Sequence, residues 1–142
     1  MEIRELTEAR VPAVAALERA CFSAPWSESS IRSELDNPLS LWLTAEEDGR
    51  LLGYVGSQTV LGESDMLNLA VAEDCRRRGV GRALCEALCA ALRARHRAEL
   101  EAAQRFRRAA EELPEFRAAF LDLAAAAERN ASALLCLMQR YV

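Results

Sequence analysis

One stretch near the middle of the chain combines a strand, a glycine-rich turn and the start of a helix. Residues 66–71 form an apolar run typical of a buried strand, and an acidic turn follows it. The segment 76–82, Arg-Arg-Arg-Gly-Val-Gly-Arg, then opens a helix. Because glycine lacks a Cβ, Gly79 and Gly81 allow a tight turn and a close approach of the backbone to a ligand. This order predicts that backbone amides converge on an anion at a helix N-terminus, where the helix dipole favours negative charge.

The arginines beside these glycines strengthen the prediction of a pyrophosphate site. A guanidinium presents planar, permanently charged donors that suit phosphate. A solvated surface run of arginines is the alternative, but the Gly-x-Gly between a strand and a helix favours phosphate binding. We therefore expect the following residues to bind the phosphates: Arg76, Arg77, Arg78, Gly79, Val80, Gly81 and Arg82.

The same residues resemble the acetyl-coenzyme A site of the GCN5-related N-acetyltransferase (GNAT) superfamily, whose motif is Gln/Arg-x-x-Gly-x-Gly/Ala. Arg76, Gly79 and Gly81 occupy its fixed positions. The segments Asn68-Leu-Ala-Val71 and Phe22-Ser-Ala-Pro-Trp-Ser27 narrow the resemblance to the RimI-type enzymes, which acetylate the N-terminal alanine of a ribosomal protein. The resemblance covers about residues 1–95.

This resemblance implies acetyl-CoA as co-substrate and a protein N-terminus, that of a ribosomal protein, as acceptor. Leu69, Ala70 and Val71 match the family strand that pairs with the pantetheine arm and polarises the acetyl carbonyl. The substrate-side loop of the family is matched by Phe22, Pro25 and Trp26. The alternative for this loop is a structural role, with its aromatic side chains anchored in the core.

The pattern up to about residue 96 predicts an α/β fold with the order βααβββα and a mixed sheet. Strands are expected over residues 1–6, 39–45, 51–60 and 66–71, with a hairpin turn across Glu47-Asp-Gly49. Thr7 and Ser27 are expected to cap the two helices that follow the first strand. A third helix begins at about Gly81.

The C-terminal part of the chain departs from the family pattern. No glycine follows Gly81, and residues 82–113 are expected to be helical. Beyond Pro114, apolar residues recur in steps of three and four, which favours a second long helix that buries them: Phe116, Phe120, Leu123 and Leu134. The family has a strand, a helix and a closing hairpin here, and a strand over residues 119–123 is the alternative.

We expect residues 1–142 to form a single GNAT-like domain, with an acetyl-CoA-binding part over 1–96 and a divergent helical tail over 97–142. A rearranged or mistranslated tail is an open alternative, although its amphipathic regularity argues against out-of-frame sequence. The apolar helix face is expected to pack in the core or against a partner, including self-association with a second copy of the chain.

The catalytic acid and base are not identified by the sequence. Acetyl transfer to an amine needs a neutral amine and a proton donor for the departing thiolate. The nearest stand-ins are Asp122 as base and Tyr141 as acid, and structural roles in a helix are the alternative for both. Asn130-Ala-Ser-Ala-Leu134 echoes a family helix whose asparagine contacts the cofactor, which makes Asn130 a further candidate.

Composition argues against three classes of protein: those that bind nucleic acids, those that span a membrane and those that bind a metal. The net charge of −4 argues against general or direct nucleic-acid binding. No apolar run is long enough to span a membrane, so a cytoplasmic protein is expected. The five cysteines lack a Cys-x-x-Cys pair and only one histidine is present, His96, so we expect no metal and a solvated histidine.

The sequence leaves two functions open. The first is an acetyl-CoA-dependent N-acetyltransferase of RimI-like descent acting on a protein N-terminus, with turnover impaired by the tail. The second is a non-catalytic acyl-CoA-binding or protein-interaction module.

Overall fold

The structure, a computed structural model, describes the backbone of residues 1–60 and 63–140 and the side chains of residues 1–60 and 64–131. The chain divides into two compact units. The first comprises Met1–Gln58 and Asp65–Leu88, and the second comprises Thr59–Ser64 and Cys89–Val142. The single domain expected from the sequence, with its division at residues 96 and 97, stays a prediction.

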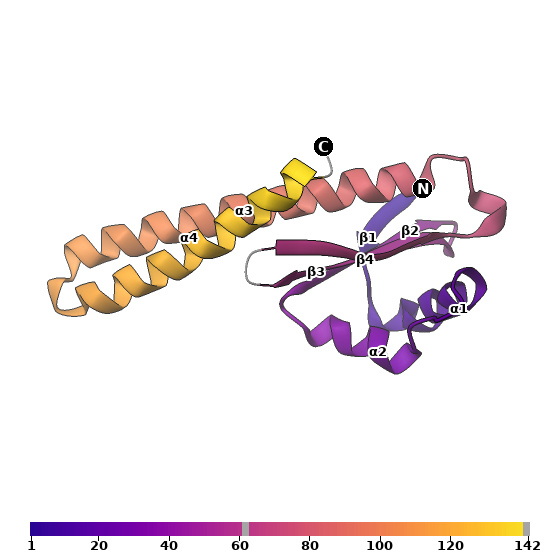
Figure 1. Cartoon of the computed structure of the whole chain (residues 1–142), viewed down its shortest axis with the longest axis horizontal. Helices are drawn as coiled ribbons and strands as arrows, with labels where there is room; N and C mark the ends of the chain where they lie inside the picture. Colours follow the sequence, from indigo (N-terminus) through magenta and orange to yellow (C-terminus); the bar gives the residue numbers. More distant parts are fainter. Residues whose placement is uncertain (61–62, 141–142) are drawn as a thin grey trace. The chain divides into compact units, whose positions relative to one another are not determined.

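The first unit is built on a four-stranded sheet in which neighbours in sequence are neighbours in space (Figure 1). Its strands are β1 (Glu2–Glu5), β2 (Ser40–Glu47), β3 (Arg50–Val60) and β4 (Glu63–Val71). Asp48 and Gly49 join β2 to β3 with positive φ angles of 50° and 77°, as a two-residue hairpin turn requires. The α/β class and the order of elements are confirmed. The mixed sheet that we expected is instead antiparallel over the described strands.

One face of this sheet is covered by the helices α1 (Val11–Cys21) and α2 (Glu28–Ser33), as Figure 1 shows. Val11, Val14 and Ala15 of α1 are fully buried, since they recur on one side of the helix. Ser27 caps α2 as expected, because its Oγ accepts a hydrogen bond of 3.0 Å from the Ser30 amide. Thr7 makes no such bond and precedes the short 3-10 helix η1 (Glu8–Arg10).

The aromatic centre of this layer depends on one glycine. Trp42 of β2 stacks on Tyr54 of β3 with ring centroids 5.7 Å apart. A Cβ at Gly56 would lie only 2.7 Å from the Trp42 ring, so only glycine lets the indole lie this close to β3. Trp26 meets the same ring edge-on, with centroids 5.5 Å apart. The loop after α1 is therefore anchored in the core of the first unit.

The opposite face of the sheet is covered by the start of α3 (Val80–Glu112). Val80 and Leu84 are buried, and a Cβ at Gly53 would meet the Leu84 side chain at 3.3 Å. Another 3-10 helix, η3 (Glu73–Cys75), connects β4 to this helix, and the buried Cys75 ends it. The strand, turn and helix predicted for residues 66–82 are confirmed.

The second unit contains an antiparallel helical hairpin (Figure 1). The later part of α3 is joined through η4 (Pro114–Phe116) to α4 (Arg117–Arg140). Polar contacts between the helices include an ion pair of 2.7 Å between Arg107 and Glu128 and a hydrogen bond of 2.5 Å between His96 Nδ1 and the Ala131 carbonyl. The two helices predicted for this region are confirmed, and the alternative strand over residues 119–123 is helix.

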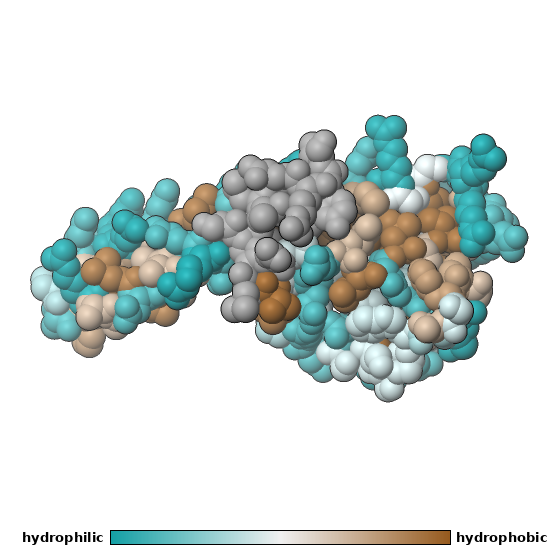
Figure 2. Space-filling view, in the orientation of Figure 1, coloured by the Kyte–Doolittle hydropathy of each residue, from teal (hydrophilic) through white to brown (hydrophobic). Residues whose placement is uncertain are grey.

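The side chains that this hairpin buries differ from our expectation. Its buried seam is lined by small residues: Ala103, Ala110, Ala124, Ala127 and Ala131. The expected burial of Phe116 and Leu123 is wrong, since they are 57% and 47% exposed, and Phe120 is only half-buried. Figure 2 shows hydrophobic surface at the turn end of the hairpin. Alanines let two helices approach closely, so the large side chains flank the seam. Leu134 lies outside the described side chains.

Two further expectations concern single features. His96 is half-buried and bonded to a carbonyl, so the solvated histidine that we expected is wrong. Among the described residues, no helix has the length and apolar character needed to cross a bilayer.

Candidate functional site

The outer edge of β4 offers free backbone groups for a ligand. β4 ends the strand order, so only β3 pairs with it in the described sheet. Beyond its end, the Ala72 amide donates to the Leu52 carbonyl of β3 at 2.8 Å. Backbone groups alternate in direction along a strand, so those of Leu69 and Val71 point to the open edge. The residues expected to line a pantetheine arm thus present polar groups there, while the Ala70 side chain is buried in the core.

The turn after β4 uses two left-handed residues to reverse the chain. Arg77 has a φ of 61° and Gly79 a φ of 83°. Glycine adopts this conformation freely, whereas for arginine it costs about 1–2 kcal/mol. A Cβ built on Gly79 meets nothing within 4 Å, so the turn faces open space. The requirement for glycine at position 79 is therefore conformational.

Free amides mark the N-terminus of α3. The first backbone bond of this helix runs from the Ala83 amide to the Gly79 carbonyl, at 3.0 Å. The three preceding amides, of Val80, Gly81 and Arg82, have no backbone carbonyl to bond in the described part of the chain. Together with the dipole of a 33-residue helix, they can bind an anion.

At Gly81, the helix α3 packs against β4. A Cβ there would lie 3.6 Å from Val71 Cγ2 and 3.7 Å from Leu69 Cδ2, which are ordinary contact distances. The fold itself therefore has room for alanine at position 81, and any stricter requirement must come from a ligand.

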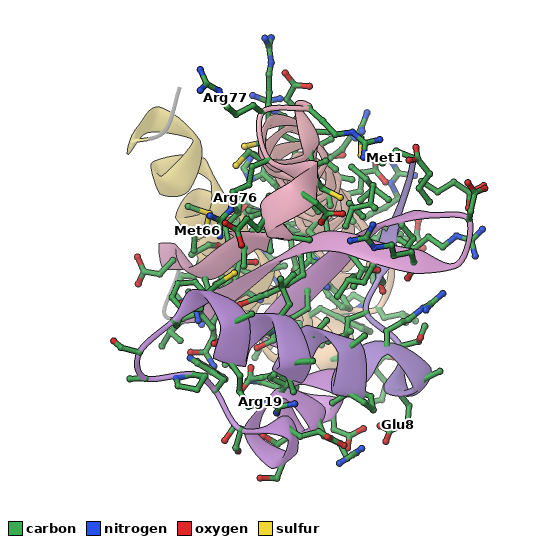
Figure 3. All side chains as sticks on the ribbon, turned by 90° about the vertical axis from the view of Figure 1, so that its right-hand side faces the viewer. Met1, Glu8, Arg19, Met66, Arg76 and Arg77 are labelled. Atoms are coloured by element: carbon green, nitrogen blue, oxygen red, sulfur yellow. The ribbon has the colours of Figure 1, made fainter. Side chains whose placement is uncertain are left out.

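The arginines predicted to bind phosphate differ in what they contact. Arg76 Nε donates to the Val71 carbonyl at 3.2 Å, so this side chain lies against the open edge of β4 (Figure 3). Arg77 projects away from the ribbon in the same figure and has no ion pair in the described part of the chain. Arg78 is paired with Glu47 at 3.0 Å, and Arg82 with Glu86 at 2.8 Å.

These pairs shift the ionisation of their members. The Glu47 carboxylate raises the pKa of Arg78 above its ordinary value. The amino group of Met1 and, second, Arg78 lower the pKa of Glu47. Glu86 likewise raises the pKa of Arg82. Among the described residues, neither Arg76 nor Arg77 has a carboxylate partner, and Arg76 donates to the Val71 carbonyl, so Arg77 is the arginine whose whole guanidinium is left to bind a ligand.

The expected substrate-side loop is partly buried. Phe22 and Trp26 pack against the core of the first unit, and Pro25 is exposed. Sequence reasoning missed the residue that anchors this loop, Glu18, which is fully buried in α1. A signal was present, since Val11, Val14, Ala15 and Glu18 follow the i, i+3, i+4, i+7 pattern of a buried helix face.

The candidates in the tail lie in the second unit. Asp122 and Asn130 are exposed residues of α4, and Tyr141 lies outside the described residues. Neither their catalytic role nor the cofactor contact of Asn130 is tested by this placement, and both stay predictions. Among the described residues, no group of histidine, cysteine and carboxylate side chains could hold a metal ion.

Comparison with known proteins agrees with this geometry. Residues 11–118 match the model of the acetyltransferase (GNAT) family. The chain belongs to this family. The [ribosomal protein bS18]-alanine N-acetyltransferase of Escherichia coli K12 is 34% identical over 87 residues, which are 61% of this chain and 57% of that protein.

Solved structures share the fold of this chain. The crystal structure of the Escherichia coli ribosomal-protein-S18-alanine N-acetyltransferase matches with a TM-score of 0.56 and 32% identity, over 62% of this chain and 56% of that chain. An aminoglycoside 6′-N-acetyltransferase complexed with coenzyme A matches with a TM-score of 0.55 and 21% identity, over 63% and 53% of the two chains. The chain spans about half the length of the curated relatives that it matches.

Proposed function

We propose that this protein is an N-acetyltransferase that transfers an acetyl group from acetyl-CoA to the N-terminal amine of a protein. The proposal rests on two features that occur together in the first unit: the open edge of β4 and the three free amides at the start of α3. Membership of the GNAT family supports it, and so does the coenzyme A in the complex of one neighbour.

The two parts of the site would hold different parts of the cofactor. The amides of Val80, Gly81 and Arg82, with the charge of Arg77, suit the pyrophosphate. The backbone groups of Leu69 and the amide of Val71, which point to the open edge, suit the amides of the pantetheine arm, whereas the Val71 carbonyl already accepts from Arg76. A strand amide pointing to the same edge could polarise the acetyl carbonyl, because a fixed donor stabilises the oxyanion that develops there.

The reaction would proceed by direct attack of the amine on the thioester. The amine nitrogen forms a bond to the carbonyl carbon, the carbon–sulfur bond breaks, and the thiolate takes a proton as the amine loses one. An α-amine titrates at about pH 7.7–8.0, so a modest base suffices. Asp122 as base and Tyr141 as acid remain predictions. If the chain lacks both functions, turnover should be about 10²–10⁴-fold slower than in an intact enzyme.

The acceptor class comes from the relatives. The Escherichia coli protein is named for acetylating an alanine of ribosomal protein bS18, and we propose a similar acceptor, a protein N-terminus beginning with alanine. A cytoplasmic location fits such a partner and is part of the same proposal.

An assay with acetyl-CoA and a peptide that begins with alanine tests the activity. We expect slow turnover in the parent and the same rate in Asp122→Asn and Tyr141→Phe if both residues are structural. Robust turnover that collapses in either variant would instead assign that residue to catalysis. No acetylation of the peptide, despite coenzyme A binding, would contradict the transferase and favour an acyl-CoA-binding module.

A second role is favoured by an exposed apolar face that runs from η4 into α4. Phe116 and Leu123 are exposed, and the Phe120 ring contacts that of Phe116 with centroids 6.5 Å apart. Such a stripe on a helix is typical of a contact surface. We propose self-association through this face. Sedimentation should show that the parent is a dimer and that the double variant Phe116→Ser/Leu123→Ser is a monomer. A monomeric parent would contradict the proposal.

A further inference from the structure

The buried carboxylate of Glu18 accepts hydrogen bonds from three separate segments of the first unit. Its Oε2 accepts from the Trp26 backbone amide at 3.0 Å. Its Oε1 accepts from Asn68 Nδ2 of β4 at 2.7 Å and also from the Tyr54 hydroxyl of β3. Glu18 is fully buried, and burying a carboxylate is costly unless it is bonded in this way.

Glu18 also holds both ends of the loop between α1 and α2. Its backbone carbonyl accepts from the Phe22 amide at 2.9 Å, while its side chain binds the Trp26 amide four residues later. The Trp26 ring is fixed further by its edge contact with Trp42. Glu18 therefore contacts the loop at both ends, through its backbone at Phe22 and through its side chain at Trp26.

The third partner connects the loop to the open edge of β4. Asn68 directly precedes Leu69, whose backbone groups point to that edge. A continuous path of hydrogen bonds thus runs from the Trp26 amide through the Glu18 carboxylate to the Asn68 side chain. Charge-assisted bonds of this kind are stronger than neutral ones, so the loop and the strand should move as one body.

We propose that Glu18 is a positioning residue that fixes the 22–26 loop, as the acceptor side of the site, relative to the β4 edge on which the acetyl group would lie. This role rests on the proposed function. Glu18 itself is fully buried, so it would act through the loop and not by contact with a substrate. Its loss should weaken acceptor binding, because the loop would no longer hold one position, and should leave coenzyme A binding at α3 intact.

Glu18→Met tests the role, since methionine keeps the length and the apolar stem but accepts no comparable hydrogen bond. Glu18→Gln is the conservative rescue, because its amide oxygen can still accept from Trp26 and Asn68 can turn its amide to match. Glu34→Met is the matched control. Glu34 also accepts from two side chains, Asn37 and Ser40, but lies in a different element, η2 (Glu34–Asp36).

Three measurements are needed on the whole chain: the KM for an alanine-initiated peptide, the coenzyme A affinity by calorimetry, and the exchange rate of the Trp26 amide proton by NMR. In Glu18→Met we expect the KM to rise about tenfold, as for one lost hydrogen bond to a charged group. The Trp26 amide should exchange faster, and coenzyme A affinity should stay the same. Glu18→Gln and Glu34→Met should resemble the parent.

A folded Glu18→Met protein with an unchanged peptide KM overturns the positioning role. A parent that binds coenzyme A but acetylates nothing overturns the proposed function, and the positioning role with it. Should Glu18→Met fail to fold, Asn68→Ala cuts the same path at the strand and is judged by the same peptide KM and Trp26 exchange.

Discussion

The Asn68 side chain on β4 donates to the Glu18 carboxylate on α1 at 2.7 Å, and the two residues are 50 positions apart in the chain. This bond ties the helical layer to the strand that carries the candidate cofactor edge. It lies among aromatic rings and buried aliphatic side chains, where polar groups must satisfy one another. The stability of the first unit should therefore depend on this polar cluster as well as on apolar contacts.

Tyr54→Phe tests that dependence most simply. The substitution keeps the ring that stacks on Trp42 and removes only the hydroxyl that donates to Glu18. We expect a loss of about 1.5–3 kcal/mol in the free energy of unfolding, the range for a hydrogen bond to a charged group. Urea denaturation measures it, and unchanged stability would show that the cluster does not need this donor.

Much of the first unit could be predicted from local signals. The Asp48-Gly49 turn, the Ser27 cap and the Gly-x-Gly turn each depend on residues close in sequence, whose conformational preferences are strong. The role of Glu18 could not be predicted in this way. Its partners come from three segments distant from one another, so a charged residue on a buried helix face was the only sequence signal.

In the tail, the sequence predicted the helices but not which of their faces is buried. The period of its apolar residues correctly predicted helices, but the face that is buried depends on how closely the two helices approach. Alanines at Ala103 and Ala127 allow a close approach, and the Phe116 ring then lies outside the seam. Hydrophobic periodicity gave no information about the distance between the helices. It favours the face with the most hydrophobic side chains, such as phenylalanine, over a face of alanines.

Substitutions in α4 should reflect this alanine seam. Ala127→Leu places a large side chain between the helices and should destabilise the second unit by about 1–3 kcal/mol. Leu121→Ala, at an exposed position of the same helix outside the face proposed for self-association, should change stability by less than about 0.5 kcal/mol. Thermal unfolding of both variants distinguishes the two sides. The reverse order of effects would contradict the burial of the alanine face.

Acid should weaken the first unit partly through Glu47. The pKa of this carboxyl is lowered from its ordinary value of 4.5 by the Met1 amino group and Arg78. A lowered pKa means that the folded state is stabilised above the ordinary pKa, and that this contribution disappears as the pH falls through the lowered value. Glu47→Gln should therefore flatten the decline in stability below about pH 5, and more so at low salt. Parallel pH profiles for both proteins would contradict this.

Arg77 should act on a ligand rather than on the fold. Arg77→Asn keeps a residue that tolerates a positive φ but removes the guanidinium. We expect unchanged or slightly higher stability and about tenfold weaker coenzyme A binding, with a smaller effect at high salt. Gly79→Ala should instead act on the fold, because alanine at a φ of 83° is strained and should cost about 1–3 kcal/mol of stability. Equal coenzyme A affinity in Arg77→Asn would remove this arginine from the site.

The proposed coenzyme A site spans the open β4 edge and the free amides that begin α3, and the proposed activity depends on it. Calorimetry with coenzyme A tests this site in the parent, in Gly81→Val and in Gly81→Ala. Alanine fits the space beside Val71 and Leu69 and is accepted by the family motif, so this variant should bind like the parent and controls for the fold.

Valine at position 81 adds two methyl groups beyond the Cβ, next to Val71 and Leu69, and should push the first turn of α3 away from β4 and so disturb the amides that would hold a pyrophosphate. We expect the parent to bind coenzyme A, and Gly81→Val, checked for folding by its thermal transition, to bind at least about tenfold more weakly. No binding in the parent, or equal binding in a folded Gly81→Val protein, would contradict the assignment of this site.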